Sequence, residues 1–268
     1  MRKTLKRIGT YFYILRTSFR QRVVYRASLW IEIVHGCFFL LLQGCLWTAL
    51  IAAGQEDTTI DEMITYVVIN DLVGRLVSFQ TNKILSARVL DGSIASDMIT
   101  PILFKWKVFF ENIGENLFDF LFSGGSTLLI ALLFFGVRAP DSVLVTVVFA
   151  VSVCIGILIS YHIHFLFGLS SFWLVRPWYL SALMGAFNKL FGGMVIPIWM
   201  YPGWLQGICG WLPFQYVTFI PIQIYLGRLS GVEIYHSLCI QLLILVGLSL
   251  CTTIIWNSAQ KKVFINGG

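Results

Sequence analysis

The residues of this chain that could do chemistry are few. Five ionisable side chains interrupt apolar stretches: Asp71, Arg75, Asp119, His164 and Lys189. A charge buried within an apolar membrane helix costs roughly 2.5 to 3.5 kcal/mol, so such charges tend to be paired or to face a cavity. Asp71 and Arg75 are four residues apart and can pair within one helix. Counting along the stretches brings Asp119 to the depth of Lys189, which predicts a second pair. We favour a buried clamp between helices over a site that lines a substrate path.

A second polar set lies in "LDGSIASDMITPI", residues 90 to 102. Leu90, Ile94 and Met98 recur every fourth residue, so a short helix over residues 86–99 would carry an apolar ridge. Charged residues flank that ridge, and Gly92 permits close backbone approach or ends a turn. The pattern fits a knob that docks into the cleft of another protein, and a plain connector is the alternative. The candidate docking residues are Arg88, Leu90, Asp91, Gly92, Ile94, Asp97 and Met98.

Several catalytic motifs are missing from the sequence. It has no GxxxxGK[ST] phosphate loop, no HExxH and no GxSxG, which argues against ATP binding by that loop, a zinc peptidase and a serine hydrolase. His162 and His164 are two residues apart, on different faces of a helix, which is poor geometry for one metal. The six cysteines show no CxxC spacing. We therefore predict no enzyme activity, metal or cofactor in this chain itself.

The elements that must position these residues are membrane helices. Of the 268 residues, 57% are hydrophobic and only 12% charged, against roughly 25% in a soluble domain. Several apolar runs approach the roughly 20 residues needed to cross a bilayer. The fold class predicted is an all-α membrane protein, with one transmembrane domain over residues 1–268 and no separate soluble domain. Its six spans lie near residues 28–53, 61–80, 114–136, 143–174, 178–198 and 233–257.

The distribution of basic residues predicts the orientation of these spans. Residues 1–26 carry eight Lys or Arg and no acid, which places the N-terminus in the cytoplasm by the positive-inside rule. Lys83, Lys105 and Arg176 flank connections on the same side, whereas Glu56 and Asp57 lie on the opposite side. Six crossings with both termini cytoplasmic satisfy this pattern.

The first 25 residues read as a separate amphipathic helix. Apolar residues recur there every three or four positions, from Leu5 and Ile8 through Phe12, Leu15 and Phe19 to Val23. Such a helix lies in the inner membrane interface, and its basic residues attract anionic lipid rather than nucleic acid. A mitochondrial presequence is the weaker alternative.

A proline-rich segment precedes the last span. Four prolines, together with Gly203, Gly207 and Gly210, prevent one straight helix between residues 195 and 227, yet the segment is too apolar for an ordinary loop. A re-entrant hairpin over residues 199–226, entering from the outer face, satisfies both constraints. It would be an outer gate or, equally, a plug that completes the bundle. The candidate gate residues are Pro197, Trp199, Pro202, Trp204, Pro213 and Phe214.

Three stretches together resemble the permease subunits of ABC-2 type transporters, the small six-span bacterial permeases that work with a separate ATPase. They are "YRASLW" at 25–30, "LDGSIASDMITPI", and "VIPIWMYPGWLQGICGWLPFQYVTFIPIQIYLG" at 195–227. The resemblance implies that residues 82–102 form a coupling loop docking on an ATPase, which would hold ATP and Mg²⁺. It also implies a second permease chain, as a homodimer or paralogous heterodimer, in a bacterial plasma membrane.

Export of a drug, peptide or lipid-like amphiphile is the function that this resemblance favours. A proton-driven secondary transporter remains the alternative from another class, although no paired inverted halves are visible in the sequence. A membrane scaffold or immunity protein without transport activity is the third reading.

Overall fold

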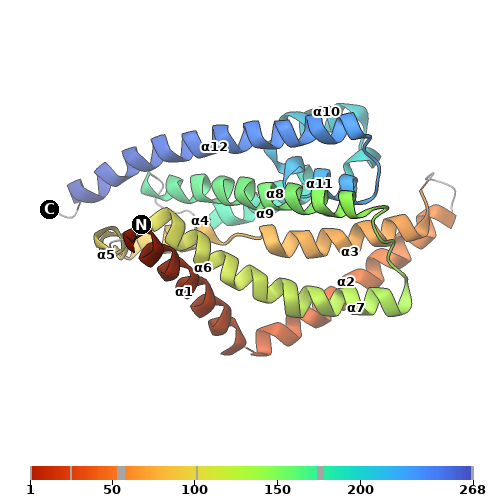
Figure 1. The fold of residues 1–268 in the computed structure, drawn as a ribbon, viewed down its shortest axis with the longest axis horizontal. Helices are drawn as coiled ribbons and strands as arrows, with labels where there is room; N and C mark the ends of the chain where they lie inside the picture. The colour runs from red at the N-terminus through yellow and green to blue at the C-terminus, as the bar shows by residue number, and fades with distance from the viewer. Residues whose placement is uncertain (1, 25, 53–57, 101, 174–177, 267–268) are drawn as a thin grey trace.

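The computed structural model describes residues 2–24, 26–52, 58–100, 102–173 and 178–266, and every regular element within these ranges is a helix (Figure 1). Glu56, Asp57 and Arg176, which contribute to the predicted orientation, lie outside these ranges. The described helices run mostly side by side, with the start of α1 and the end of α12 at the same end of the molecule (Figure 1). The all-helical architecture agrees with the fold class predicted from the sequence.

Four helical stretches are long and apolar enough to cross a membrane: Leu29–Ala52, Phe104–Phe134, Val143–Phe172 and Gly231–Lys261. They make the chain a multi-pass membrane protein. The first lies in α2 (Arg26–Ala52) and the last in α12 (Gly231–Asn266). The second joins α6 (Phe104–Asp119), the π-helical turn η1 (Phe120–Gly124) and α7 (Gly125–Phe134). The third joins α8 (Val143–Leu169) to the 3-10 turn η2 (Ser170–Phe172).

The other two predicted spans correspond to shorter helices. Helix α3 (Ile60–Val77) has 18 residues and α9 (Trp178–Phe191) has 14, or about 27 and 21 Å at 1.5 Å per residue. Helix α9 ends before Gly192 and Gly193, and Gly193 has a φ of 70° that other residues rarely adopt. The predicted span 178–198 therefore extends beyond its helix, and six crossings remain a prediction.

The helix of the second predicted span, 61–80, ends three residues before the predicted end. Helix α3 ends at Val77 and α4 (Thr81–Leu90) begins four residues later. Two carbonyl oxygens at the end of α3 accept bonds from neighbouring helices, from Asn116 Nδ2 to Leu76 at 3.0 Å and from Ser160 Oγ to Val77 at 2.6 Å. The backbone N–H of Gln80 donates to Asn112 Oδ1 at 2.8 Å. Side chains of α6 and α8 thus satisfy the polar groups that the break exposes.

The connection predicted as one helix over residues 86–99 is two helices. Helix α4 ends at Leu90, and α5 (Ile94–Ile99) begins after Gly92, whose φ of 76° turns the chain. Helix α6 then begins at Phe104, ten residues before the predicted span. Figure 1 shows α5 at the same end as the start of α1.

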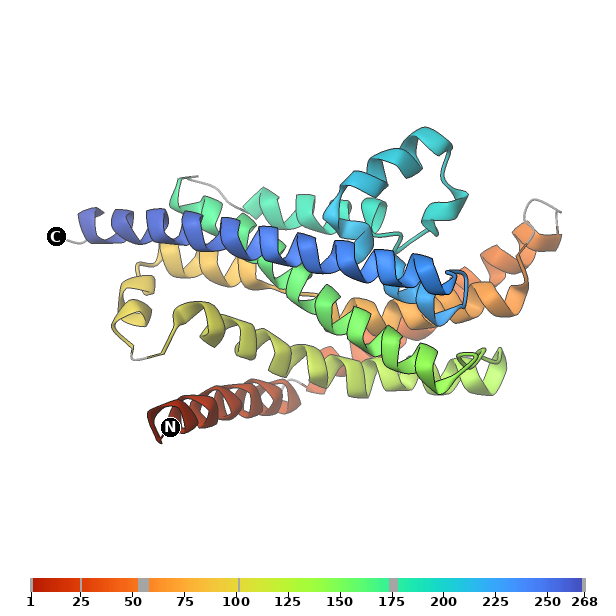
Figure 2. The ribbon, with the colours of Figure 1, turned by 45° about the horizontal axis from the view of Figure 1, so that its top comes forward.

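The N-terminal helix α1 (Arg2–Val24) packs along α6 (Figure 2). Ser18 is buried there, and a Cβ added to Gly114 of α6 would collide with the carbonyl oxygen of Leu15. The Tyr11 and Phe110 rings stack with centroids 5.2 Å apart. Part of the apolar stripe points elsewhere, because Ile8 and Phe12 are exposed. The side chain of Leu5 lies outside the part of the chain that the structure describes.

The predicted re-entrant segment consists of short helices. These are η3 (Ile198–Met200), α10 (Gly203–Trp211), η4 (Pro213–Tyr216) and α11 (Phe219–Tyr225). Helix α11 is buried against α8, whereas α10 projects from the bundle (Figure 2). Prolines precede or open three of these four turns, which explains why the segment is not one helix.

Candidate functional site

The polar connection, which consists of α4, α5 and the turns beside them, is held in place by four charged side chains from three helices. Arg88 of α4 donates to Asp97 of α5 at 3.0 Å and to Glu111 of α6 at 2.9 Å. Lys107 of α6 donates to the other oxygen of Asp97 at 2.6 Å. All four side chains are largely shielded from solvent, which strengthens such pairs relative to exposed ones. The network therefore fixes α4 and α5 to the start of α6.

The predicted apolar ridge does not form. Ile94 is only 3% exposed and packs in a cluster with Leu85, Phe104 and Phe165. Leu90 is 63% exposed, and Met98 is half-buried. The spacing of four fails as a guide because the turn at Gly92 separates residue 90 from residues 94 and 98. Within the connection itself, large exposed apolar side chains are instead Leu90, Ile99 and Leu103.

Asp91 and Gly92 form the exposed turn between α4 and α5. The Asp91 carboxylate accepts the backbone N–H of Ser93 at 2.9 Å. Hydrogen bonds from the Ser93 hydroxyl and backbone lower the pKa of the Asp91 carboxyl. Asp91 therefore stays charged at the tip of the connection, beside the exposed side chain of Leu90.

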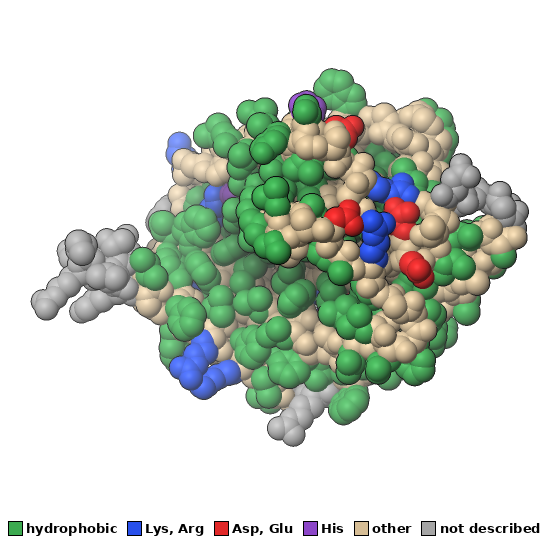
Figure 3. Space-filling view, turned by 45° about the vertical axis from the view of Figure 1, so that its right-hand side comes forward, with side chains coloured by type: hydrophobic (Ala, Val, Ile, Leu, Met, Phe, Trp, Pro, Cys, Tyr) green, Lys and Arg blue, Asp and Glu red, His purple; other side chains and the backbone are tan. Residues whose placement is uncertain are grey.

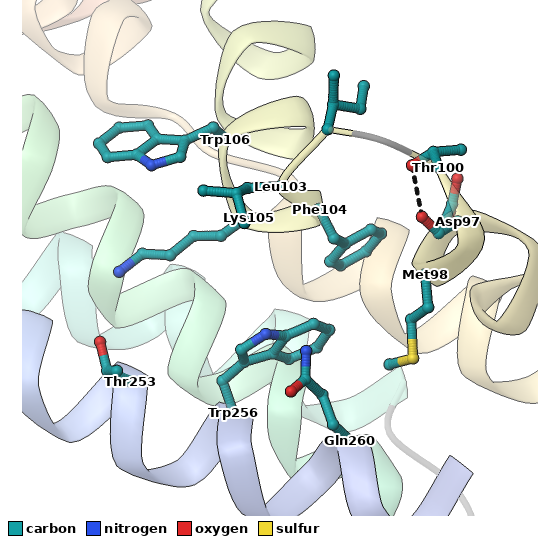
Figure 4. Close-up of a pocket in the computed structure, with 11 residues that line it drawn as sticks. Asp97, Met98, Thr100, Leu103, Phe104, Lys105, Trp106, Thr253, Trp256 and Gln260 are labelled. Carbon is teal, nitrogen blue, oxygen red and sulfur yellow. Dashed lines mark hydrogen bonds between the residues drawn. The ribbon is translucent and has the colours of Figure 1, made fainter. Parts of the chain in front are cut away.

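A groove of about 500 Å³ lies next to this connection, between α5, the start of α6 and the end of α12 (Figure 4). The Phe104 and Trp256 rings stack across it with centroids 5.4 Å apart. Met98 points toward Trp256 and Gln260 in Figure 4, and Thr100 donates to the carbonyl oxygen of Asp97 at 2.6 Å. Aromatic side chains on this groove thus connect the start of α6, beside the polar connection, to the last helix.

The predicted ion pair between Asp71 and Arg75 is present in α3. Arg75 Nε and Nη2 donate to the two carboxylate oxygens at 2.9 and 3.1 Å, and Nη1 donates to Ser123 Oγ at 2.6 Å. Gly36 and Gly124 leave room for the arginine, since a Cβ at either position would meet it at 3.2 or 3.1 Å. Arg75 thus joins α3 to α2 and to the π-helical turn η1.

The predicted pair between Asp119 and Lys189 is wrong. Asp119 accepts a bond from Arg22 of α1 at 2.6 Å, and Arg22 also lies 3.4 Å from Glu32 of α2. Lys189 is exposed on α9. Asp119 and Lys189 were predicted to lie at the same depth in the membrane. Helix α1 packs against α6, however, and its Arg22 is the cation that pairs with Asp119.

His164 does not join the charged residues. Its Nδ1 lies 2.8 Å from the carbonyl oxygen of Ser160, one turn earlier in α8. His162 lies 3.2 Å from Thr252 of α12. Within the described ranges, no three His, Cys, Asp or Glu side chains are grouped to hold a metal ion.

At the opposite end, Arg228 holds the proline-rich segment. Its guanidinium pairs with Glu62 of α3 and lies 4.0 Å from the centre of the Trp199 ring. The same tryptophan contacts Tyr66, whose hydroxyl donates to the carbonyl oxygen of Gly193 at 2.5 Å. Figure 3 brings this end forward and shows acidic and basic side chains gathered on a largely apolar surface.

The six predicted gate residues are divided between the interior and the surface. Pro197 and Phe214 are buried, Trp199 and Pro213 are half-buried, and Pro202 and Trp204 are exposed. Trp204 projects from α10, so it does not face the other candidates across a closed path. The Trp199 ring contacts Phe219, at 5.6 Å between ring centres, and it packs against the same apolar cluster as Phe214.

Sequence reasoning missed Arg22, Lys107, Glu111 and Arg228 as members of these networks. A signal for two of them was present, because charged residues recur every fourth position along α6, from Lys107 through Glu111 and Glu115 to Asp119. That spacing marks one charged helix face. No such periodicity marks Arg22 or Arg228, whose partners are distant in the sequence.

Comparison with known proteins gives one family match. A family model described as "ABC-2 family transporter protein" matches residues 52–267, which is most of the chain. A search of curated proteins finds no match.

Proposed function

The chain belongs to the ABC-2 family of transporter proteins, and from this membership we propose that it is the membrane-spanning permease subunit of an exporter driven by a separate ATPase. The family and the apolar helices make it a transmembrane component of an ABC transporter. The ATPase would bind ATP and Mg²⁺, since the sequence carries no phosphate loop of its own. A second permease chain, identical or paralogous, would complete the path.

The braced connection between α4 and α6 is the observation that carries the coupling proposal. Two short helices are held to α6 by Arg88, Asp97, Lys107 and Glu111, so a force applied to them is passed to the bundle. The tip is exposed and carries Leu90 beside the charged Asp91. An exposed apolar side chain on a rigid, charged turn suits a partner's cleft.

The proposed topology has six crossings with both termini in the cytoplasm. It is supported by the basic N-terminus and by the position of the start of α1, the end of α12 and α5 at one end of the molecule. In this topology α3 and α9 supply the two shorter crossings. The segment from η3 to α11 lies at the outer end, where Arg228 and Trp199 would hold a gate closed.

The test is purification of the tagged chain in mild detergent from membranes of the organism that encodes it. We expect a subunit with a GxxxxGK[ST] loop to co-purify in fixed ratio and to hydrolyse ATP, with hydrolysis changed by the permease. Absence of such a subunit, together with uptake into vesicles driven by a pH gradient, would instead support the proton-driven transporter.

A further inference from the structure

The groove between α5, the start of α6 and the end of α12 lies at one surface of the membrane (Figure 4). Its α6 residues open the candidate span Phe104–Phe134, and its α12 residues lie near the end of the candidate span Gly231–Lys261. Tryptophans gather at this level of membrane proteins, and Trp106 and Trp256 both line the groove. The groove is therefore placed where lipid head groups meet acyl chains.

The charged groups on the wall of this groove leave one cation without a counter-ion. Asp97 supplies a carboxylate, but it already receives Arg88 at 3.0 Å and Lys107 at 2.6 Å. Lys105 is half-buried, and its ammonium forms no ion pair or hydrogen bond with the described residues. In Figure 4 its side chain extends from α6 in the direction of Thr253 of α12. A shielded lysine of this kind attracts an anion, because a charge pair in such surroundings is stronger than one in water.

Three neutral side chains on the same wall supply further hydrogen-bond donors. The indole N–H groups of Trp106 and Trp256 and the side-chain amide of Gln260 form no hydrogen bonds within the described ranges. Helix α6 also begins here without a side-chain cap, so its N-terminus adds partial positive charge. A ligand that satisfies this wall must therefore accept hydrogen bonds, and phosphate oxygens are strong acceptors.

Apolar side chains continue from the groove toward the hydrocarbon. Leu103 on the wall is exposed, and so are Ile254, next to Thr253, and Leu250, one turn deeper in α12. A soluble anion would fill the polar part of the groove and leave these side chains uncovered. A molecule that carries both a phosphate and acyl chains covers both surfaces.

We propose that this groove binds the head group of an anionic phospholipid of the phosphatidylglycerol type. The phosphate accepts from the Lys105 ammonium, the glycerol hydroxyls accept from Gln260 and the indole N–H groups, and the acyl chains follow α12 past Ile254. Phosphatidylcholine has the same phosphate, but its trimethylated ammonium would lie beside a lysine and a carboxylate, Asp97, that is already paired. The anionic lipid is therefore preferred.

The first experiment uses the unaltered chain in its purified complex. The complex is incubated in detergent with equal amounts of phosphatidylglycerol, phosphatidylethanolamine and phosphatidylcholine that share the same acyl chains. It is then washed at about 1 M salt, which screens exposed charges such as those of α1, and retained lipid is counted by mass spectrometry. We expect about tenfold more phosphatidylglycerol than phosphatidylcholine, which equals one charge-assisted hydrogen bond. Equal retention of the three lipids would overturn the proposal.

The second experiment compares Lys105→Gln with Lys83→Gln, which removes an exposed lysine of α4 that does not line the groove. Lys105→Gln should bring the ratio of retained phosphatidylglycerol to phosphatidylcholine close to one, whereas Lys83→Gln should leave it near ten. An unchanged ratio in Lys105→Gln would refute the site. Equal loss in both variants would assign the preference to general surface charge and overturn the proposal in the same way.

The third experiment fills the groove without changing its charge. Thr253 is exposed on the wall, so Thr253→Phe should fold normally, with an unchanged melting temperature in detergent, and should also lose the preference. Full retention in this variant would show that the lipid binds elsewhere. Soluble glycerol phosphate is the last probe: if it raises the melting temperature as much as phosphatidylglycerol does, the lipid assignment fails. None of these outcomes depends on whether an ATPase is the driving partner.

Discussion

Replacing Leu90 or Ile94 by aspartate should separate docking from folding at the proposed coupling connection. The two residues are four positions apart and were predicted to lie on one face. In the structure Leu90 is 63% exposed and Ile94 is 3% exposed. The same substitution therefore meets water at one position and a packed apolar cluster at the other.

The expected magnitudes differ accordingly. Truncating a buried isoleucine costs about 2 to 5 kcal/mol, and an aspartate at Ile94 would also bury a charge, so we expect Ile94→Asp to unfold the protein or lower its melting temperature strongly. Leu90→Asp should change the free energy of unfolding by no more than about 0.5 kcal/mol. If Leu90 fills a pocket on the ATPase, the change should weaken association by about 2 kcal/mol, or roughly 30-fold.

The assay is thermal unfolding of the purified permease, combined with titration of the ATPase subunit onto permease in detergent. Ile99→Asp is the matched companion, because Ile99 is 84% exposed on α5. The reasoning is refuted if both exposed variants bind the ATPase as the unaltered chain does. A stable Ile94→Asp protein that has lost ATPase binding would also refute it, because it would show that residue 94 faces the partner.

Three further experiments test the ion networks. Asp97→Asn removes a charge shared by two cations and should lower the free energy of unfolding by about 1 to 3 kcal/mol; an unchanged thermal melt would show that the brace is not needed for stability. Arg22→Met and Asp119→Asn should each destabilise the protein, and the double variant should recover part of the loss because neither member of this pair is then left as a charge without the other. A double variant that is the sum of the singles would contradict direct pairing. Arg228→Gln should raise the reactivity of buried Cys209 toward an impermeant thiol reagent, in a background without other cysteines, because the segment from η3 to α11 loses its anchor. Equal labelling rates would exclude that anchoring role.

The long helices could be predicted because hydrophobic runs of sufficient length have few alternatives in a bilayer. The start of α6 could not be found in this way, since Lys105 and Lys107 lowered the local hydropathy and resembled a flanking loop. Their helix is specified by packing against α1 and by charged residues repeating every fourth position. Hydropathy alone does not report either feature.

Local pairs were predictable and distant pairs were not. Asp71 and Arg75 lie on one helix, where a spacing of four determines their distance. The partner of Asp119 depends on which helices are neighbours, and the sequence gives depth along a span but not adjacency. Lys189 satisfies the depth and fails the adjacency, because its side chain is exposed on α9. Similarly, Ile94 turned inward because one glycine conformation at Gly92 changed the helix direction.

The gap between α3 and α4 determines how the molecule can transmit displacement. A continuous helix would act as a stiff rod along its own axis, but α3 and α4 are separated by residues 78–80, which are not helical. Backbone groups at the break form hydrogen bonds to side chains of neighbouring helices: the Gln80 N–H to Asn112 of α6, and the carbonyl oxygens of Leu76 and Val77 to Asn116 of α6 and Ser160 of α8. Gln80, next to α4, is bonded to α6, and the end of α3 is bonded to α6 and α8, so a movement of α4 would act on α6 as well as on α3. A displacement of the connection would therefore be shared among α3, α6 and α8 through these side-chain hydrogen bonds, where an unbroken helix would pass it along its own axis alone.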